Sequence, residues 1–80
     1  MSKLQTQLGS RIRELRGLAG WSREQFAPKV RLSERRIAAL ELGNGWPRPD
    51  AVERISKSFG LEVRDLFDFS SSRVMPRKKI

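Results

Sequence analysis

The sequence predicts an all-α fold, because its apolar residues recur at helical spacing and helix start and stop signals divide them into five segments. No run of residues alternates apolar and polar side chains in the way that a half-buried strand requires. The chain has 80 residues and neither cysteine nor histidine, so disulfides are excluded and the common zinc ligands are absent. A chain this short makes one domain that needs nearly all of its apolar side chains for its core, and oligomerisation is a reasonable source of further stability.

The first helix is expected over residues 3–18. Leu8, Ile12 and Leu15 follow one another at the spacing of one helix face, and Arg11 lies on the polar side. Two glycines near the end of this segment weaken the helix and open a turn.

The second helix begins after Ser22, whose hydroxyl forms with the side chain of Gln25 the reciprocal pattern of a capping box. Trp21 before the cap and Phe26 inside the helix are spaced as a hydrophobic staple. Pro28 has no N–H to donate and crowds the preceding turn. We therefore expect this helix to be short or bent.

Three further helices follow. Ser33 caps a third helix that runs to Glu41 or Leu42. Pro49 suits the first turn of a fourth helix, and a short fifth helix is expected over residues 62–67. The predicted core residues are Leu8, Ile12, Leu15, Phe26, Val30, Leu32, Ile37, Leu40, Val52, Ile55, Phe59 and Leu66.

Charge is distributed unevenly along the chain, which has a net charge of +8 and a pI of about 11.4. Residues 11–36 carry eight basic and three acidic residues, whereas residues 41–69 carry four basic and six acidic ones. Residues 70–80 carry four basic residues and no acidic one, and their low apolar content predicts a disordered basic tail. This asymmetry suits a module with one face on a polyanion and another on a protein partner.

Other classes of protein find little support in the composition. An enzyme is not expected, because the serines have no partner base, the carboxylates are not paired and no glycine-rich phosphate loop is present. The segment MSKLQTQLGS has no long apolar run, so neither a signal peptide nor a membrane span is predicted. We expect a cytoplasmic protein without metal or cofactor.

The segments LGSRIRELR, WSREQFA and VRLSERRIAALELG, followed by a proline-led helix and FGLEVRDLF, resemble a known type of DNA-binding domain. This is the helix-turn-helix domain of the Cro and phage-repressor type, found in the xenobiotic-response-element family of small bacterial regulators. The resemblance covers Leu8 to Phe67 and implies a repressor-like domain over residues 1–69. It also implies sequence-specific binding to double-stranded DNA, usually as a symmetric homodimer on a near-palindromic site.

Arg31 departs from the pattern of this family, which usually has glycine in the turn between the second and third helices. Glycine is favoured there because the residue often takes a left-handed conformation, which costs a side-chain-bearing residue roughly 1 kcal/mol. Either Arg31 carries that strain or the turn is slightly opened.

The resemblance implies that the third helix, within residues 33–42, enters the major groove with its first residues at base edges. Arg35 is the leading candidate for a base contact, since one guanidinium can donate to O6 and N7 of guanine together. Glu34 either accepts from N4 of cytosine or serves only as a partner of the helix dipole. Arg36 suits a base or a phosphate equally. Ala39 permits close approach to a base, unless it reflects helix propensity alone.

Phosphate contacts are expected at two helix starts and one loop. Arg23 opens the second helix, where the family commonly contacts a phosphate and where free backbone N–H groups favour an anion. Ser22 and Ser33 cap their helices and can also contact phosphate. Asn44 and Arg48 flank the loop after the third helix, where they either contact the DNA backbone or are solvated loop residues.

Two further sets of residues are assigned to structure and assembly. The resemblance implies that Arg16 and Glu41 pair as a clamp between the first and third helices. Trp46 either packs its loop against the core or contacts a second subunit. With it, the candidates for a dimer interface are Trp46, Leu61, Val63, Phe67 and Phe69.

Two functions remain in competition. The first is a DNA-binding transcriptional regulator, and the second is an antitoxin or adaptor whose frame mainly holds a protein partner. The arginines at positions 23, 35 and 36 favour the first, because a module that only binds a protein has no reason to gather guanidinium groups on the groove-facing helix. No attached effector-binding segment is recognised, so a small-molecule effector is not expected.

Overall fold

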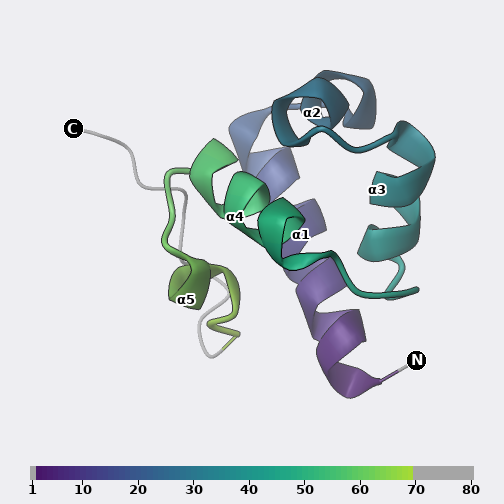
Figure 1. The fold of residues 1–80 in the computed structure, drawn as a ribbon, viewed down its shortest axis with the longest axis vertical. Coiled ribbons are helices and arrows are strands. Elements are labelled where there is room, and N and C mark those ends of the chain that lie inside the picture. Colours follow the sequence, from purple (N-terminus) through teal and green to yellow (C-terminus); the bar gives the residue numbers. More distant parts are fainter. Residues whose placement is uncertain (1, 70–80) are drawn as a thin grey trace.

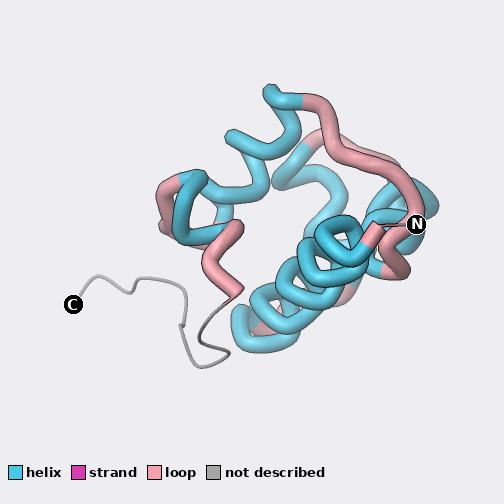
Figure 2. Tube along the Cα trace, turned by 90° about the horizontal axis from the view of Figure 1, so that it is seen from below, coloured by secondary structure: helices cyan, strands magenta, loops and turns pink. Residues whose placement is uncertain are grey.

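The computed structural model describes residues 2–69, which form five helices joined by loops (Figure 1). Figure 2 shows helix and loop but no strand in this part of the chain, so the predicted all-α class is confirmed. The predicted basic tail, residues 70–80, lies outside the described residues. The helices are α1 (Lys3–Ala19), α2 (Arg23–Val30), α3 (Glu34–Glu41), α4 (Pro49–Ser58) and α5 (Val63–Leu66).

The first helix, α1, is capped at both ends. The hydroxyl oxygen of Ser2 accepts from the backbone N–H of Gln5, and the Gln5 side chain accepts from the N–H of Ser2. The helix ends at Ala19, one residue beyond the expected end, because Gly20 takes a left-handed conformation with φ of 79°. The Gly20 N–H then donates to carbonyls of the last turn, which closes the helix.

The position of Arg11 corrects the expectation that it lies on the polar side of α1. Only 4% of Arg11 is exposed, and its Nη2 donates to the carbonyl oxygen of Asp65 at 2.9 Å. Helix α5 packs against α1 and covers this flank. The periodicity of one helix cannot reveal such a contact, because it depends on where a distant segment docks.

Helix α2 follows the predicted start signals closely. Ser22 and Gln25 form the capping box, with the Ser22 Oγ accepting from the Gln25 N–H at 3.0 Å. The rings of Trp21 and Phe26 stack with centroids 5.9 Å apart, as the hydrophobic staple requires. Pro28 lies inside the helix, which is short at eight residues, in agreement with the prediction.

The turn between α2 and α3 is made by Arg31. Its φ is 58° and its ψ is 42°, so of the two alternatives it is the strained left-handed backbone that occurs. The N–H groups of Arg31 and Leu32 both point to the carbonyl of Ala27, which ends α2. The chain then reaches Ser33, whose Oγ accepts from the N–H of Arg36 at 3.0 Å and starts α3.

One hydrophobic core joins the helices. Trp21, Phe26 and Phe59 form a stack that connects α2 with the end of α4. Leu32 and Val52 were expected in the core but are only partly buried at its edge. Ala51 and Leu61, which were not predicted as core residues, are buried. Among the described residues, no helix combines the length and the apolar content that a membrane crossing needs.

The crossing of α1 and α3 depends on Gly9, which is buried. A β-carbon built at this position would lie 2.8 Å from the carbonyl oxygen of Glu41 and would also collide with that of Leu40. The two helix backbones can therefore approach this closely only with glycine at position 9. This contact fixes where the end of α3 lies relative to α1.

Candidate functional site

The beginning of α3 presents a charged surface to solvent. Ser33, Glu34 and Arg35 are all exposed. Because Ser33 accepts a hydrogen bond through its oxygen, its hydroxyl proton stays free to donate to an incoming acceptor. The same holds for Ser22 at the start of α2. Each capping serine can therefore also serve as a donor to a phosphate.

Arg35 differs from Arg36, its neighbour in the sequence. Within residues 2–69 its side chain makes neither a hydrogen bond nor an ion pair, and it is exposed at the second position of α3. Glu34 beside it is also exposed and has no ion-pair partner in that part of the chain. A free guanidinium with five donors is available there for an acceptor such as a guanine edge or a phosphate.

Arg36 and Ala39 are both partly buried, in contrast to Arg35. The Nη2 of Arg36 donates to the carbonyl oxygen of Trp46 at 2.6 Å. This side chain therefore turns toward the loop between α3 and α4. Arg36 and Arg35 are neighbours in the sequence, but the structure gives them different surroundings.

Glu41 is bound by two arginines. Its Oε2 accepts from Arg16 Nε at 2.7 Å, and its Oε1 accepts from Arg23 Nε at 3.1 Å. The Glu41 side chain is 1% exposed, whereas that of Arg23 is 42% exposed. The hydrogen bond with Glu41 raises the pKa of the Arg16 guanidinium above its usual value. This cluster joins α1, α2 and α3, and it holds the start of α2 beside the end of α3.

The structure therefore adds a partner to Arg23, which the sequence placed only on phosphate. Arg23 lies at the first position of α2 and shares Glu41 with Arg16, while much of its side chain stays in solvent. No local pattern links position 23 with position 41, since the pairing requires α2 and α3 to be packed together.

The loop between α3 and α4 carries the other two predicted phosphate contacts. Asn44 and Arg48 are exposed. The Nε of Arg48 lies 3.9 Å from Asp50 Oδ1, a long ion pair between two exposed groups that holds Arg48 only weakly. Both side chains are thus accessible to a ligand that approaches this loop.

The predicted interface residues fall into two groups. Trp46 and Val63 are exposed and line a groove of about 390 Å³ together with Phe67. Phe67 and Phe69 are partly buried, and the centroids of their two rings lie 6.3 Å apart. Leu61 is 7% exposed and belongs to the core cluster, because Gly60 turns the chain so that Leu61 packs inward. Of the predicted interface residues, Trp46 and Val63 are therefore the ones that remain exposed.

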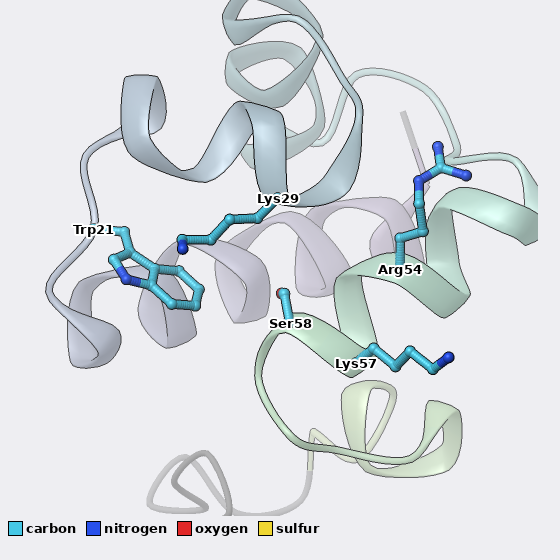
Figure 3. A pocket seen from close by; sticks show the side chains of 5 residues that line it. All are labelled: Trp21, Lys29, Arg54, Lys57 and Ser58. Atoms are coloured by element: carbon cyan, nitrogen blue, oxygen red, sulfur yellow. The ribbon is translucent and has the colours of Figure 1, made fainter.

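A second open pocket, of about 450 Å³, lies between α2 and α4 (Figure 3). It is lined by Trp21, Lys29, Arg54, Lys57 and Ser58. The Nζ of Lys29 lies 4.7 Å from the centre of the Trp21 ring. Arg54 Nε donates to the carbonyl oxygen of Val30 at 2.7 Å and so satisfies the last turn of α2. Arg54 therefore connects α4 to the end of α2, a role that the sequence did not predict.

A family model described as a helix-turn-helix domain matches residues 7–68. The chain is 33% identical over 60 residues to the competence pilus inhibition repressor of Acinetobacter baylyi, covering 75% of this chain and 54% of that protein. It is 31% identical over 72 residues to the control protein C.BamHI of Bacillus amyloliquefaciens, covering 89% of each. It is 32% identical over 65 residues to an uncharacterized HTH-type transcriptional regulator of Archaeoglobus fulgidus, covering 81% of this chain and 93% of that protein. No solved structure matches the chain significantly.

Proposed function

The chain belongs to the helix-turn-helix domain family, and from this membership we propose that it is a sequence-specific, double-stranded DNA-binding transcriptional regulator. In this proposal residues 33–42 enter the major groove and the protein acts in the cytoplasm as a homodimer on a near-palindromic operator. Occupation of the operator blocks or recruits polymerase by position alone, so the scheme requires no small-molecule effector. The names of the relatives, a repressor, a control protein and a transcriptional regulator, support the same class of function.

The observation that carries the proposal is the free guanidinium of Arg35 at the start of α3. It is exposed and has no partner within the described part of the chain, so it can donate to O6 and N7 of one guanine without losing an existing bond. In this proposal Glu34 beside it accepts from N4 of cytosine, and the small side chain of Ala39 one turn later lets the helix lie close to the base pairs.

Phosphate contacts on both sides of α3 would fix its register in the groove. At the start of α2, Ser22 and the exposed part of Arg23 lie beside free backbone N–H groups. Ser33 offers a hydroxyl proton at the start of α3, and Asn44 and Arg48 are accessible on the loop that follows it. These contacts supply affinity for any duplex, while the base contacts select among sequences.

The homodimer is proposed from the exposed apolar groove. Trp46 is 45% exposed and Val63 42% exposed, and a second copy of the chain that covers them would remove this apolar surface from water. In such a dimer the two copies of α3 would meet half-sites about 34–36 Å apart, one turn of DNA.

Selection of binding sites from a random duplex pool at near-physiological salt tests the proposal. We expect enrichment of a two-fold symmetric site with half-sites about one helical turn apart. Weak binding without any enriched site, with affinity that collapses as salt rises, would show that the basic charge acts non-specifically. The antitoxin or adaptor function would then become the better account.

Replacement of Arg35 by alanine separates base reading from general attraction. We expect Arg35→Ala to weaken binding to the selected site by about 1–3 kcal/mol and to relax the preference at one base pair. Titration of the selected duplex and of duplexes changed at single positions measures both effects. If the base preference of the variant were the same as that of the wild type, α3 would not read bases through Arg35.

A further inference from the structure

The Arg36 side chain lies along the backbone of the loop between α3 and α4. Its Nη2 donates to the carbonyl oxygen of Trp46 at 2.6 Å. A β-carbon placed on Gly45 would lie 3.2 Å from Nη1 of the same guanidinium. Both terminal nitrogens of Arg36 therefore face this loop, and Gly45 leaves the room that they occupy.

This contact braces a part of the loop that has little other support. The N–H groups of Gly43 and Asn44 donate to carbonyls of the last turns of α3, which ties down the beginning of the loop. In residues 45–47, within the described part of the chain, the hydrogen bond from Arg36 is the one that reaches a helix. Gly45 has φ of 97° and Pro47 has no N–H, so this stretch cannot hold itself by regular hydrogen bonding.

The braced loop carries side chains with two different tasks in the proposed function. Asn44 and Arg48 are the accessible polar groups, and Trp46 lines the apolar groove. Arg36 itself lies on α3 immediately after Arg35. The hydrogen bond from Arg36 thus ties the middle of the loop to the helix that is proposed to read bases, beyond the point where the backbone bonds of Gly43 and Asn44 hold its beginning.

We propose that Arg36 is a positioning residue: it holds the loop so that the contacts of Asn44 and Arg48 stay in register with α3, and it does not read a base. This inference rests on the proposed DNA-binding function and replaces the base or phosphate contact that the sequence suggested for Arg36. Arg35 supplies the base contact, and its neighbour supplies the geometry in which the loop meets the same duplex.

The test compares Arg36→Ala and Arg36→Lys with Arg64→Ala, which removes an equal charge from α5, on the side of the molecule away from α3 (Figure 1). A hydrogen bond from a charged donor corresponds to a loss of about tenfold in affinity. We expect Arg36→Ala to lose about tenfold on the selected operator and on unrelated duplexes alike, beyond the loss in Arg64→Ala. The base preference recovered by site selection should match that of the wild type. Arg36→Lys, which can still donate to the Trp46 carbonyl, should recover part of the affinity.

The indole N–H resonance of Trp46 and the amide exchange of residues 44–48 report on the loop without DNA. Arg36→Ala should shift the resonance and accelerate exchange, and Arg64→Ala should change neither. A relaxed preference at one base pair in Arg36→Ala would overturn the proposal, because Arg36 would then read a base. A loss equal to that of Arg64→Ala would overturn it as well. If the wild type enriched no site, the DNA-binding proposal would fail separately, and an unchanged loop in Arg36→Ala would still refute the positioning role.

Discussion

A single side chain, Glu41, forms ion pairs with two arginines from different helices. Its carboxylate is almost fully buried, and it is neutralised by Arg16 from α1 and by Arg23 from α2. A buried carboxylate needs such partners, because leaving it unpaired is strongly destabilising. The Arg16 side chain is largely buried beside Glu41. The Arg23 side chain is 42% exposed, so it can also bind a second anion. The same acidic group therefore stabilises the helix packing and orients a proposed phosphate contact.

Asp50 gives a prediction for the dependence of stability on pH. The hydrogen bond from Arg54, together with backbone N–H groups at the start of α4, holds the pKa of Asp50 below its usual value of 3.8. A carboxyl whose pKa is lowered on folding stabilises the fold above its unfolded pKa, and this contribution disappears as pH falls through the lower, folded value. We expect Asp50→Asn to lower the thermal midpoint at pH 7 and to have a much smaller effect well below pH 3.8.

Circular dichroism melting curves at the two pH values measure this difference. Glu53→Gln is a matched control, because Glu53 is an exposed carboxylate on the same helix without an ion pair in residues 2–69. An equal destabilisation by Asp50→Asn at both pH values would mean that the charge of Asp50 is not what stabilises α4.

At the scale of elements, the relation between helices is set by a few backbone positions. Arg31 makes the turn from α2 to α3 with a left-handed backbone, and Gly9 lets α1 approach α3. Capping serines decide where α2 and α3 begin, and these starts are also the proposed contact points with DNA. Small changes at these positions therefore alter both stability and the direction in which α3 faces its target.

The strain at Arg31 predicts an order of stability between two variants. Arg31→Gly and Arg31→Ala remove the same guanidinium, but only glycine takes the left-handed conformation without a steric penalty. We expect Arg31→Gly to be more stable than Arg31→Ala by about 1 kcal/mol in urea denaturation. Equal stability of the two would mean that the turn relaxes to another conformation when the side chain is shortened.

Gly9 and Gly17 lie on the same helix, but we expect their replacement by alanine to change the stability of the protein in opposite directions. Gly9→Ala should destabilise the protein by about 1–3 kcal/mol, because the new methyl group meets the carbonyl oxygens at the end of α3. A β-carbon at Gly17 meets nothing within 4 Å, so Gly17→Ala should stabilise α1 by up to about 1 kcal/mol. Urea denaturation of both variants is the measurement. Stabilisation by Gly9→Ala would show that α1 and α3 are not in close backbone contact.

On the scale of the whole molecule, charge and apolar surface are divided between different regions. Figure 1 shows α3 and α5 on opposite sides of the molecule. The exposed Arg35 lies on α3, whereas the groove of Trp46, Val63 and Phe67 involves the loop and the last helix. Such a division lets one copy contact a duplex and a second copy at the same time, as the proposed homodimer requires.

Arg23 gives the corresponding prediction for the dependence of binding on salt. Removing one phosphate contact should weaken binding to all duplexes alike and lower the slope of log K against log salt by about 1. We expect this from Arg23→Ala, measured by titrations at several salt concentrations. Arg64→Ala on α5 should leave the slope nearly unchanged. Since Arg23 also binds Glu41, a melting curve of the variant is needed to confirm that it is folded. A salt slope equal to that of the wild type would remove Arg23 from the phosphate contacts.

Much of the fold could be predicted because its signals are local. The capping box of α2, the hydrophobic staple, the short α2 and the proline at the start of α4 each depend on residues within about one helical turn. The resemblance to helix-turn-helix regulators is likewise confirmed by the family match over residues 7–68. The position of the candidate site at the start of the third helix was predictable, because it follows from the order of the helices in this family. The contacts of its residues with DNA stay predictions.

By itself the sequence determined the five helices with approximate boundaries, the family and the charged start of α3, since these depend on local hydrogen bonding and on the order of motifs. Only the tertiary structure decided which charged and apolar residues are covered. Arg11 and Leu61 became buried, Arg23 joined Glu41, and Arg36 turned away from Arg35 to the loop. Each of these contacts joins segments that are distant in sequence or separated by a loop. Their partners exist only after the helices have packed, and so periodicity and capping signals could not reveal them.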